Sequence, residues 1–208
     1  AASHWNLAKN RHEREPKLAV YCPLSKTGKT RKTVIDVVSD DLAFLVDSIV
    51  AEINRHSLLI DFLIHPFFYV SYDSKGVLSD VRTKPKKGYV RQSHIHIHIK
   101  DTVGDDILKQ LEDGLYIALN DVYTANRDWR KMLHRLEDAR NELAKANTKR
   151  DPKEVRRYCA FLDYLHNNNF TLLGYREYQF SEGKNGVKSK IVKGRSLGLL
   201  DDETRPAY

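Results

Sequence analysis

The chain has 208 residues, 41% of them hydrophobic and 30% charged, with a formal net charge of +7 at pH 7. This composition predicts a soluble globular protein, and no apolar run approaches the roughly 20 residues that a membrane-spanning helix needs. Lysines and arginines are scattered among acidic residues. Their densest group, Arg82 with Lys84-Pro85-Lys86-Lys87, lacks interleaved aromatics. We interpret it as a solvated loop and expect no nucleic-acid and no membrane partner.

The first residues are expected to dock loosely on the rest of the fold or to belong to a part of the protein upstream. The chain does not begin with methionine, and we expect it to be a piece of a longer protein. Residues 1–16 are predicted to be a helical segment that ends at Glu15-Pro16, because the residue before a proline disfavours helical geometry. Residues 17–22 are predicted to be a strand. Cys22 and Cys159, each within an apolar pattern, are expected to be reduced, buried thiols, as in a cytoplasmic protein.

A short β-branched strand followed by an amphipathic helix forms the central pattern of the chain. Residues 33–38, Thr-Val-Ile-Asp-Val-Val, suit a buried strand. After them, apolar residues recur at a spacing that makes one stripe on a helix of about four turns. These residues are Leu42, Leu45, Val46, Ile49, Val50 and Ile53. Between strand and helix, Ser39, Asp40 or Asp41 is predicted to cap the first helical turn.

The next part of the chain is predicted to add antiparallel strands. Residues 58–72 are rich in strand-forming side chains, but Pro66 cannot donate to a sheet, so we expect two segments with a bend at His65-Pro66. Residues 77–89 are predicted to be irregular. Residues 90–100 alternate strictly, with isoleucines facing the core and histidines facing solvent or a partner. The alternating residues are Ile95, Ile97 and Ile99 against His94, His96 and His98. The order strand, helix, strand, strand matches the first three-quarters of a ferredoxin-like βαββαβ unit.

The second half of the chain begins with a long helix. Apolar residues keep a helical spacing from about residue 105 to 146 without a proline, which predicts one helix of about 40 residues, or two with a break near residues 126–128. The charged second half of this helix needs a packing partner, such as the next helix folded back as a hairpin. That next helix is predicted to start at Asp151-Pro152, with aspartate as the cap and proline in the first turn.

A β-hairpin is predicted at the end of the chain. Residues 170–180 and 187–192 suit strands, and Asn185-Gly186 between them is a favourable hairpin turn. One helix and one hairpin cannot bury much surface alone. We therefore interpret residues 169–208 as the start of a second, truncated β-containing module.

Three stretches of the sequence together resemble a known family. They are Val-Val-Ser-Asp-Asp-Leu-Ala-Phe-Leu-Val-Asp-Ser at residues 37–48, Ile64-His65-Pro66, and Asn-Phe-Thr-Leu-Leu-Gly-Tyr-Arg-Glu-Tyr at residues 169–178. Read together, they resemble the N-terminal region of the large, bacterial-type NAD-specific glutamate dehydrogenases. The resemblance covers roughly residues 3–202. It implies a region that precedes the catalytic part of an oxidoreductase of amino-acid metabolism.

The resemblance also implies a fold. The N-terminal region of these enzymes resembles a string of ACT-like regulatory modules, which are α+β units with a βαββαβ antiparallel sheet and helices on one face. We expect an N-terminal helical segment at 1–16, an ACT-like domain at 17–125, a helical connector at 126–168 and the second module at 169–208. Because no final strand is evident after the long helix, residues 17–22 are expected to take an edge place in the sheet.

The histidine strand is the most conspicuous candidate for a metal site. Alternate residues of a strand place imidazoles about 6–7 Å apart on one face, and imidazole is a common zinc ligand. No nearby acid or cysteine at fixed spacing completes the shell, and only His96 matches the family pattern, so we expect no metal ligands. The alternative hypothesis is a stand-alone metal-binding protein or enzyme that uses His94, His96 and His98.

The strand-to-helix corner is the expected effector site, by analogy with ACT domains. An amino-acid effector would bind near Asp40, Asp41 and Asp47, or at an interface between modules. We expect no catalytic and no cofactor-binding residue in this chain, because it has no Gly-x-Gly-x-x-Gly motif and Gly28-Lys29-Thr30 lacks the earlier glycine of a P-loop.

The predicted function follows from the resemblance. We expect a non-catalytic regulatory or assembly region of a cytoplasmic NAD-dependent glutamate dehydrogenase, which interconverts L-glutamate and 2-oxoglutarate plus ammonia. NAD would bind to the full-length enzyme outside this region. The expected partners are the other domains of the same chain and further copies in a homo-oligomer.

Overall fold

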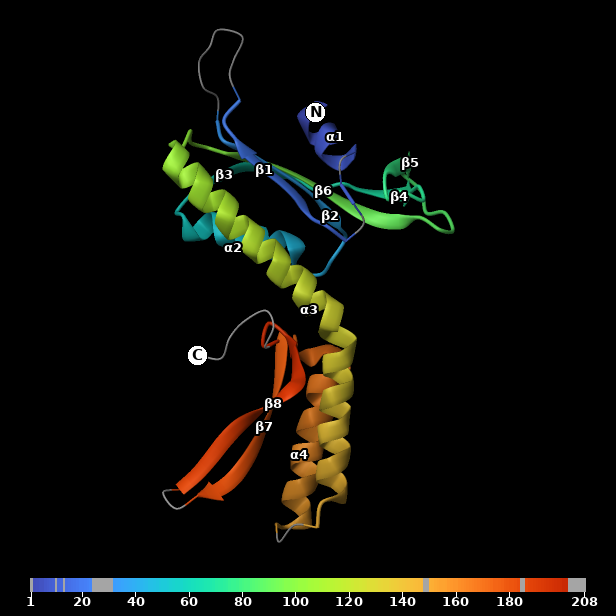
Figure 1. The fold of residues 1–208 in the computed structure, drawn as a ribbon, viewed down its shortest axis with the longest axis vertical. Coiled ribbons are helices and arrows are strands. Elements are labelled where there is room, and N and C mark those ends of the chain that lie inside the picture. Colours follow the sequence, from blue (N-terminus) through green and yellow to red (C-terminus); the bar gives the residue numbers. More distant parts are fainter. Residues whose placement is uncertain are drawn as a thin grey trace. The chain divides into compact units, whose positions relative to one another are not determined.

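The computed structural model describes residues 2–9, 11–12, 14–23, 32–147, 150–183 and 186–201. Gly28-Lys29-Thr30 and Asn185 of the predicted hairpin turn lie outside the described residues. The chain divides into two compact units, residues 1–122 and 123–208 (Figure 1). The residues that we had divided into a connector and a second module fall within one unit. In the described part of the chain, no helix is both long and apolar enough to cross a membrane.

Unit 1 is a mixed α+β fold built on one antiparallel sheet (Figure 1). Its elements are α1 (Ala2–Lys9), β1 (Lys17–Tyr21), β2 (Val34–Asp40), α2 (Leu45–Arg55), β3 (Ile60–Ile64), β4 (Phe67–Tyr72), β5 (Leu78–Arg82), β6 (Val90–Ile99) and the first part of α3 (Asp105–Lys145). The strand order is β1-β2-β6-β4-β5, and β3 also pairs with β6. The predicted α+β class with an antiparallel sheet is confirmed.

Strand β6 pairs with two successive strands on one of its sides. β3 pairs with its later residues, from His96 to Ile99, and β4 pairs with its earlier residues, from Val90 to Ser93. Between β3 and β4 the chain bends at His65-Pro66, as predicted. The backbone N–H of His94 donates to the Pro66 carbonyl at 2.9 Å, so the bend still accepts a hydrogen bond from β6 although proline cannot donate one.

Strand β1 lies at an edge of the sheet. β1 pairs with β2 from Lys17 opposite Val38 to Tyr21 opposite Val34, as predicted. The order along unit 1 is therefore β-β-α-β-β-β-β-α between α1 and the end of the unit, not βαββαβ. The prediction that residues 77–89 are irregular was wrong, because β5 lies within them and pairs with β4.

The core of unit 1 lies between the isoleucine face of β6 and two helices. Ile95, Ile97 and Ile99 are fully buried, which confirms the face predicted for them. They form one cluster with residues of β2, α2 and α3: Ile35, Val37, Leu45, Ile49, Ile53, Leu111, Leu115, Leu119 and Val122. Each fully buried Leu or Ile contributes about 1.5–3 kcal/mol. This face therefore holds most of the apolar stabilisation of unit 1.

The predicted capping of the central helix was wrong. α2 begins at Leu45, and its N-cap is Phe44, which has a φ of +65° and makes no side-chain capping hydrogen bond. β2 extends through Asp40, and the carboxylates of Asp40 and Asp41 form ion pairs with arginines instead. Such charge-assisted pairs are stronger than a neutral cap, and residues 41–44 are used to turn the chain.

Unit 2 combines helices with a hairpin. It contains the later part of α3, α4 (Pro152–Tyr164), a single π-helical turn at Leu165–Asn169, β7 (Gly174–Gly183) and β8 (Gly186–Gly198). α3 is one helix of 41 residues, so the alternative with a break near residue 127 is excluded. α4 folds back on it, with Arg140 and Asp163 joined by an ion pair of 3.1 Å. The predicted cap is confirmed, because the Asp151 side chain accepts from Lys153 N and proline follows it.

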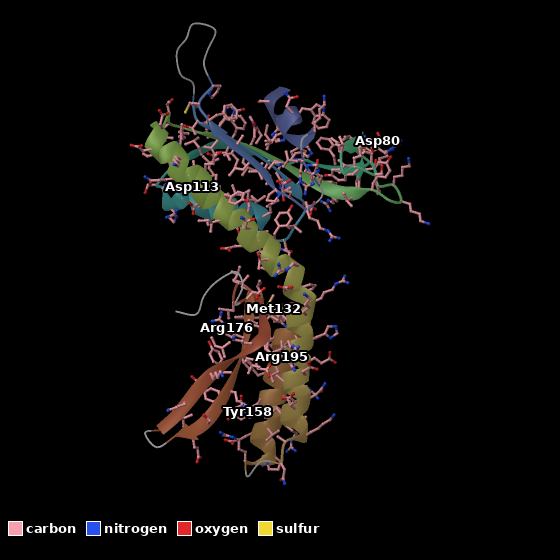
Figure 2. The ribbon with its side chains drawn as sticks, viewed as in Figure 1. Asp80, Asp113, Met132, Tyr158, Arg176 and Arg195 are labelled. Carbon is pink, nitrogen blue, oxygen red and sulfur yellow. The ribbon has the colours of Figure 1, made fainter. Side chains whose placement is uncertain are left out.

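The apolar residues of unit 2 are only partly covered. Met132 of α3, labelled in Figure 2, is 1% exposed, and Cys159 of α4 is buried as a free thiol, while Cys22 in unit 1 is a half-buried free thiol. In contrast, Phe161, Phe180 and Val187 are 58%, 69% and 71% exposed. α4 and the hairpin thus carry apolar side chains at the surface of unit 2.

Candidate functional site

The histidine face of β6 is covered by the N-terminal helix. We had predicted helices on one face of the sheet only and histidines that face solvent or a partner, but α1 packs on this second face (Figure 1). His94 is 3% exposed. Its ring lies 5.3 Å from that of His4 and 5.9 Å from that of Trp5, both on α1. The face predicted for a partner is thus occupied, in large part, by a segment of the same chain.

Asp36 is the centre of the polar contacts beneath α1. It lies on β2, alternates with Ile35 and Val37, and is 1% exposed. Its Oδ1 atom is 2.8 Å from His4 Nδ1 and 2.5 Å from His96 Nδ1. Its Oδ2 atom accepts from the Tyr21 hydroxyl at 2.8 Å. Groups from α1, β1 and β6 therefore converge on one carboxylate of β2.

The outer nitrogens of both imidazoles also have histidine partners. His4 Nε2 lies 3.1 Å from His94 Nδ1, and His96 Nε2 lies 3.0 Å from His98 Nε2. His94 Nε2 is in turn 2.8 Å from Gln92 Oε1. All three predicted histidines thus belong to one hydrogen-bonded layer, which we call the polar layer: His4, Tyr21, Asp36, Gln92, His94, His96 and His98.

Burial and hydrogen bonds set the charges in the polar layer. Burial by itself raises the pKa of Asp36, but hydrogen bonds from His4, His96 and Tyr21 outweigh it and lower the pKa to about 2. Burial, with the nearby charges of His4 and Arg11, lowers the pKa of His94 to about 4. At neutral pH, Asp36 is therefore ionised and His94 is neutral, which leaves His94 with one donor and one acceptor nitrogen.

The polar layer continues to the predicted effector corner. Gln92 Nε2 donates to the Tyr72 hydroxyl at 2.7 Å, and Arg11 Nη1 donates to the same oxygen at 2.7 Å. The fully buried guanidinium of Arg11 pairs with Asp40. The corner is therefore tied to the segment after α1 through a buried cation.

The other predicted corner residues have different surroundings. Asp41 pairs with Arg91 at 2.8 Å and accepts from Ser93 Oγ at 3.3 Å. Asp47 lies in the first turn of α2 and is exposed. The structure thus brings Asp40 and Asp41 together with arginines, whereas Asp47 points away from the apolar stripe.

A shallow pocket of about 420 Å³ adjoins the polar layer. His4, His94 and His96 line its polar side. The remaining walls are apolar or aromatic and come from α1, β3, β4 and the bend between those strands: Trp5, Ile64, Pro66 and Phe68. Small ligands can therefore reach two of the imidazoles that contact Asp36.

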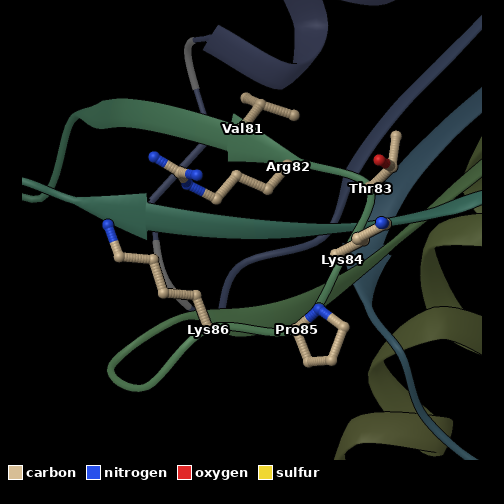
Figure 3. A pocket seen from close by; sticks show the side chains of 6 residues that line it. All are labelled: Val81, Arg82, Thr83, Lys84, Pro85 and Lys86. Carbon is tan, nitrogen blue, oxygen red and sulfur yellow. The ribbon is translucent and has the colours of Figure 1, made fainter.

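The basic group around residue 84 forms a second, open pocket (Figure 3). Arg82 at the end of β5 pairs with Asp80 at 2.9 Å. The Lys86 ammonium lies 4.9 Å from the centre of the Tyr89 ring. Both cations are exposed, and each already has an acidic or aromatic neighbour within its own loop.

Sequence reasoning missed His4, Asp36 and Arg11 as site residues. The single sequence signal for Asp36 is an acid within an otherwise β-branched strand, because a buried acid requires partners. His4 and Arg11 lie in a segment of low amphipathicity. Nothing in the spacing of residues connects that segment to residues 36 and 96.

Comparison with known proteins assigns the chain to a family. Residues 1–115 match the family model described as "Glutamate dehydrogenase, ACT1 domain". The chain belongs to this family. The match contains the whole polar layer, and unit 2 lies beyond it. The predicted resemblance to NAD-specific glutamate dehydrogenases is thereby confirmed.

The chain is similar to the beginning or another small part of much longer proteins. It is 28% identical over 201 residues to a protein named NAD-specific glutamate dehydrogenase from Pseudomonas aeruginosa, covering 95% of this chain and 12% of that protein. It is 29% identical over 203 residues to the protein of the same name from Halomonas elongata, covering 95% of this chain and 13% of that protein. The chain thus spans about an eighth of the length of these relatives. No solved structure matches it.

Proposed function

We propose that this chain is the non-catalytic N-terminal regulatory and assembly region of an NAD-dependent glutamate dehydrogenase. The full-length protein would convert L-glutamate, NAD and water to 2-oxoglutarate, ammonia and NADH. The observation that carries the proposal is the match of residues 1–115 to an ACT1 domain model. The names of the relatives, of which this chain covers 12–13%, support the activity of the whole protein.

The surroundings of the titratable groups support a non-catalytic role. In the described part of the chain, Asp36 and the histidines around it are hydrogen-bonded to one another. The sequence has no Gly-x-Gly-x-x-Gly motif for a dinucleotide. NAD would therefore bind elsewhere in the full-length enzyme. In this proposal, the enzyme is cytoplasmic.

Exposed apolar groups support an assembly role for unit 2. Phe161, Phe180 and Val187 are each more than half exposed, and a two-stranded hairpin gains stability by packing on further structure. In this proposal, the surface contacts other domains of the same chain or another subunit of a homo-oligomer.

Activity assays test the proposal. The 208-residue chain is expected to give no glutamate-dependent reduction of NAD, followed as absorbance of NADH. In the full-length protein, deletion of residues 1–122 is expected to leave the rate of the chemical step unchanged. It should change the response to effectors or the subunit stoichiometry, the latter measured by light scattering. Turnover by the chain alone would contradict the proposal, as would a deletion variant with unchanged regulation and assembly.

The effector site of the proposed regulation is the strand-to-helix corner. The partly exposed side chains of Asp41 and Arg91 place charges of both signs together, which suits the ammonium and carboxylate groups of an amino acid. Asp41→Asn is expected to weaken the binding of an amino-acid effector roughly 10- to 100-fold, because a hydrogen bond to a charged group contributes about 1.5–3 kcal/mol.

Calorimetric titration of the chain with glutamate and a panel of other amino acids measures this effect. Asp113→Asn is the matched control, because Asp113 is exposed on α3 (Figure 2) and its substitution is expected to leave affinity unchanged. Equal losses in both variants would show that the corner does not bind the effector.

A further inference from the structure

Three metal-ligating side chains from three separate elements converge beneath α1. His4 lies on α1, Asp36 on β2 and His96 on β6. Their ligand atoms all lie within 4.8 Å of one another. Two imidazoles and one carboxylate are a common donor set for zinc and for other first-row transition metals.

The hydrogen bonds at the outer nitrogens leave both Nδ1 atoms directed at Asp36. Gln92 Nε2 donates to Tyr72, so its Oε1 atom faces His94 Nε2 and accepts from it. His94 Nδ1 is then an acceptor, and the hydrogen between His94 and His4 lies on His4 Nε2. His4 therefore turns its Nδ1 atom toward the carboxylate while its Nε2 atom donates.

His96 makes contacts at the corresponding atoms. Its Nδ1 atom is 2.5 Å from Asp36 Oδ1, and its Nε2 atom is 3.0 Å from His98 Nε2. The Asp36 Oδ1 atom therefore lies within hydrogen-bond distance of the Nδ1 atoms of both imidazoles. A single divalent cation bound between these three atoms can replace both contacts, while the contacts of the outer nitrogens with His94 and His98 are retained.

We infer that His4 Nδ1, His96 Nδ1 and the Asp36 carboxylate form a binding site for one divalent transition-metal ion, with zinc as the best match. This inference goes beyond the proposed function and does not depend on it. His94 and His98 would be the outer partners that orient the two imidazole ligands, as metal-bound histidines require. Tyr21, which donates to Asp36 Oδ2, would orient the carboxylate.

The geometry requires only a small adjustment to admit the ion. Metal–nitrogen bonds of about 2.0–2.1 Å place ligand atoms roughly 3–3.4 Å apart, against the present 2.5 and 2.8 Å between Asp36 and the two imidazoles. α1 has eight residues and can shift as a unit. Because His4 and His96 also line the pocket of about 420 Å³, a solvent ligand can complete a four-coordinate shell.

The ion would join the N-terminal helix to the two central strands of the sheet. After treatment with a chelator, the 208-residue chain is expected to bind one Zn²⁺ in a calorimetric titration. Co²⁺ is expected to give the visible absorption of a low-symmetry, four-coordinate site. Zinc should also raise the melting temperature of unit 1, since a ligand that binds only the folded state stabilises it.

Substitution of single histidines tests the assignment. His4→Gln and His96→Gln are each expected to lower zinc affinity by at least about 100-fold, the upper end of the loss caused by removing an outer partner. His134→Gln is the control, because His134 lies on α3 in unit 2 with its side chain 80% exposed. The zinc affinity of this variant should match that of the parent chain.

Circular dichroism of the zinc-free proteins establishes that the variants are folded. His4 lies on the surface helix α1, so the His4→Gln variant is expected to fold even if His96→Gln perturbs the sheet. The inference is overturned if the parent chain binds no zinc with the expected stoichiometry, or if a folded His4→Gln variant binds it as tightly as the parent chain. A loss of the same size in His134→Gln would also overturn it.

Discussion

Replacement of Asp40 by alanine is expected to destabilise unit 1 by about 3 kcal/mol, because removal of one partner from a buried ion pair leaves the other charge uncompensated. Arg11 is fully buried, whereas the Asp40 side chain is 23% exposed. The Arg11 guanidinium would keep its hydrogen bonds to Tyr72 and the Glu15 carbonyl, but it would lose its ion pair with the Asp40 carboxylate. Asp40 therefore stabilises the fold, and its substitution is a poor test of effector binding.

Arg11→Met is the matched control for this first prediction. It removes the buried charge and keeps much of the side-chain volume, and the remaining carboxylate can reach water, so we expect a smaller loss than for Asp40→Ala. The chain has two tryptophans, Trp5 in unit 1 and Trp129 in unit 2. Urea unfolding followed by Trp5 fluorescence in a Trp129→Phe background reports on unit 1 alone. Equal midpoints for Asp40→Ala and the parent chain would contradict the prediction.

Replacement of Asp128 by alanine is expected to destabilise unit 2 by about 3 kcal/mol. Asp128 lies on α3 and is 1% exposed. It accepts from Arg127 Nη2 at 2.7 Å, from Lys131 Nζ at 3.0 Å and from the backbone N–H of Gly198 in β8 at 3.1 Å. The substitution would leave the buried Gly198 N–H unpaired and remove a link between the long helix and the hairpin.

The charge of Asp128 also makes the stability of unit 2 depend on pH. Hydrogen bonding from Arg127, against the opposing effect of burial, and then from Gly198 and Lys131 holds its pKa well below the usual range. A lowered pKa adds stability above the unfolded-state value of about 3.9, and this stability is lost as the pH falls below about 4. Asp128→Asn should therefore show a smaller loss of stability from pH 5 to pH 2 than the parent chain.

Trp129 fluorescence in a Trp5→Phe background measures both effects in unit 2. Asp151→Asn is a suitable comparison, because Asp151 is an exposed helix cap in the same unit and asparagine serves equally well as a cap. An acid transition of Asp128→Asn identical to that of the parent chain would contradict the assigned role.

Periodicity predicted the parts of the fold in which burial dominates. The alternation of residues 90–100 gave both faces of β6, and apolar spacing gave α3 as a single helix, because those patterns are set by one apolar core. β5 has only two apolar residues, Leu78 and Val81, and it forms by pairing with β4 at the end of the sheet. Its pattern is therefore too weak to be recognised from the sequence.

Specific polar contacts decided the points at which prediction failed. Asp40 and Asp41 resemble helix caps in the sequence. In the structure, their carboxylates form ion pairs with arginines that lie 29 and 50 positions away. The polar layer also joins residue 4 to residues 36 and 94. Hydrogen bonds between positions so far apart have no local sequence signature, which is why the histidines of β6 were recognised and His4 and Asp36 were not.

The place of β1 at the sheet edge has a consequence for how the domain is dissected. The regular pattern of strands and helices begins at residue 33, which invites a shortened version that starts there. Such a version would remove β1 while β2 kept its pairing with β6, and the backbone groups of β2 that pair with β1 would be exposed. A bare, largely apolar margin of this kind recruits strands from other molecules, so the leading residues protect the domain from self-association.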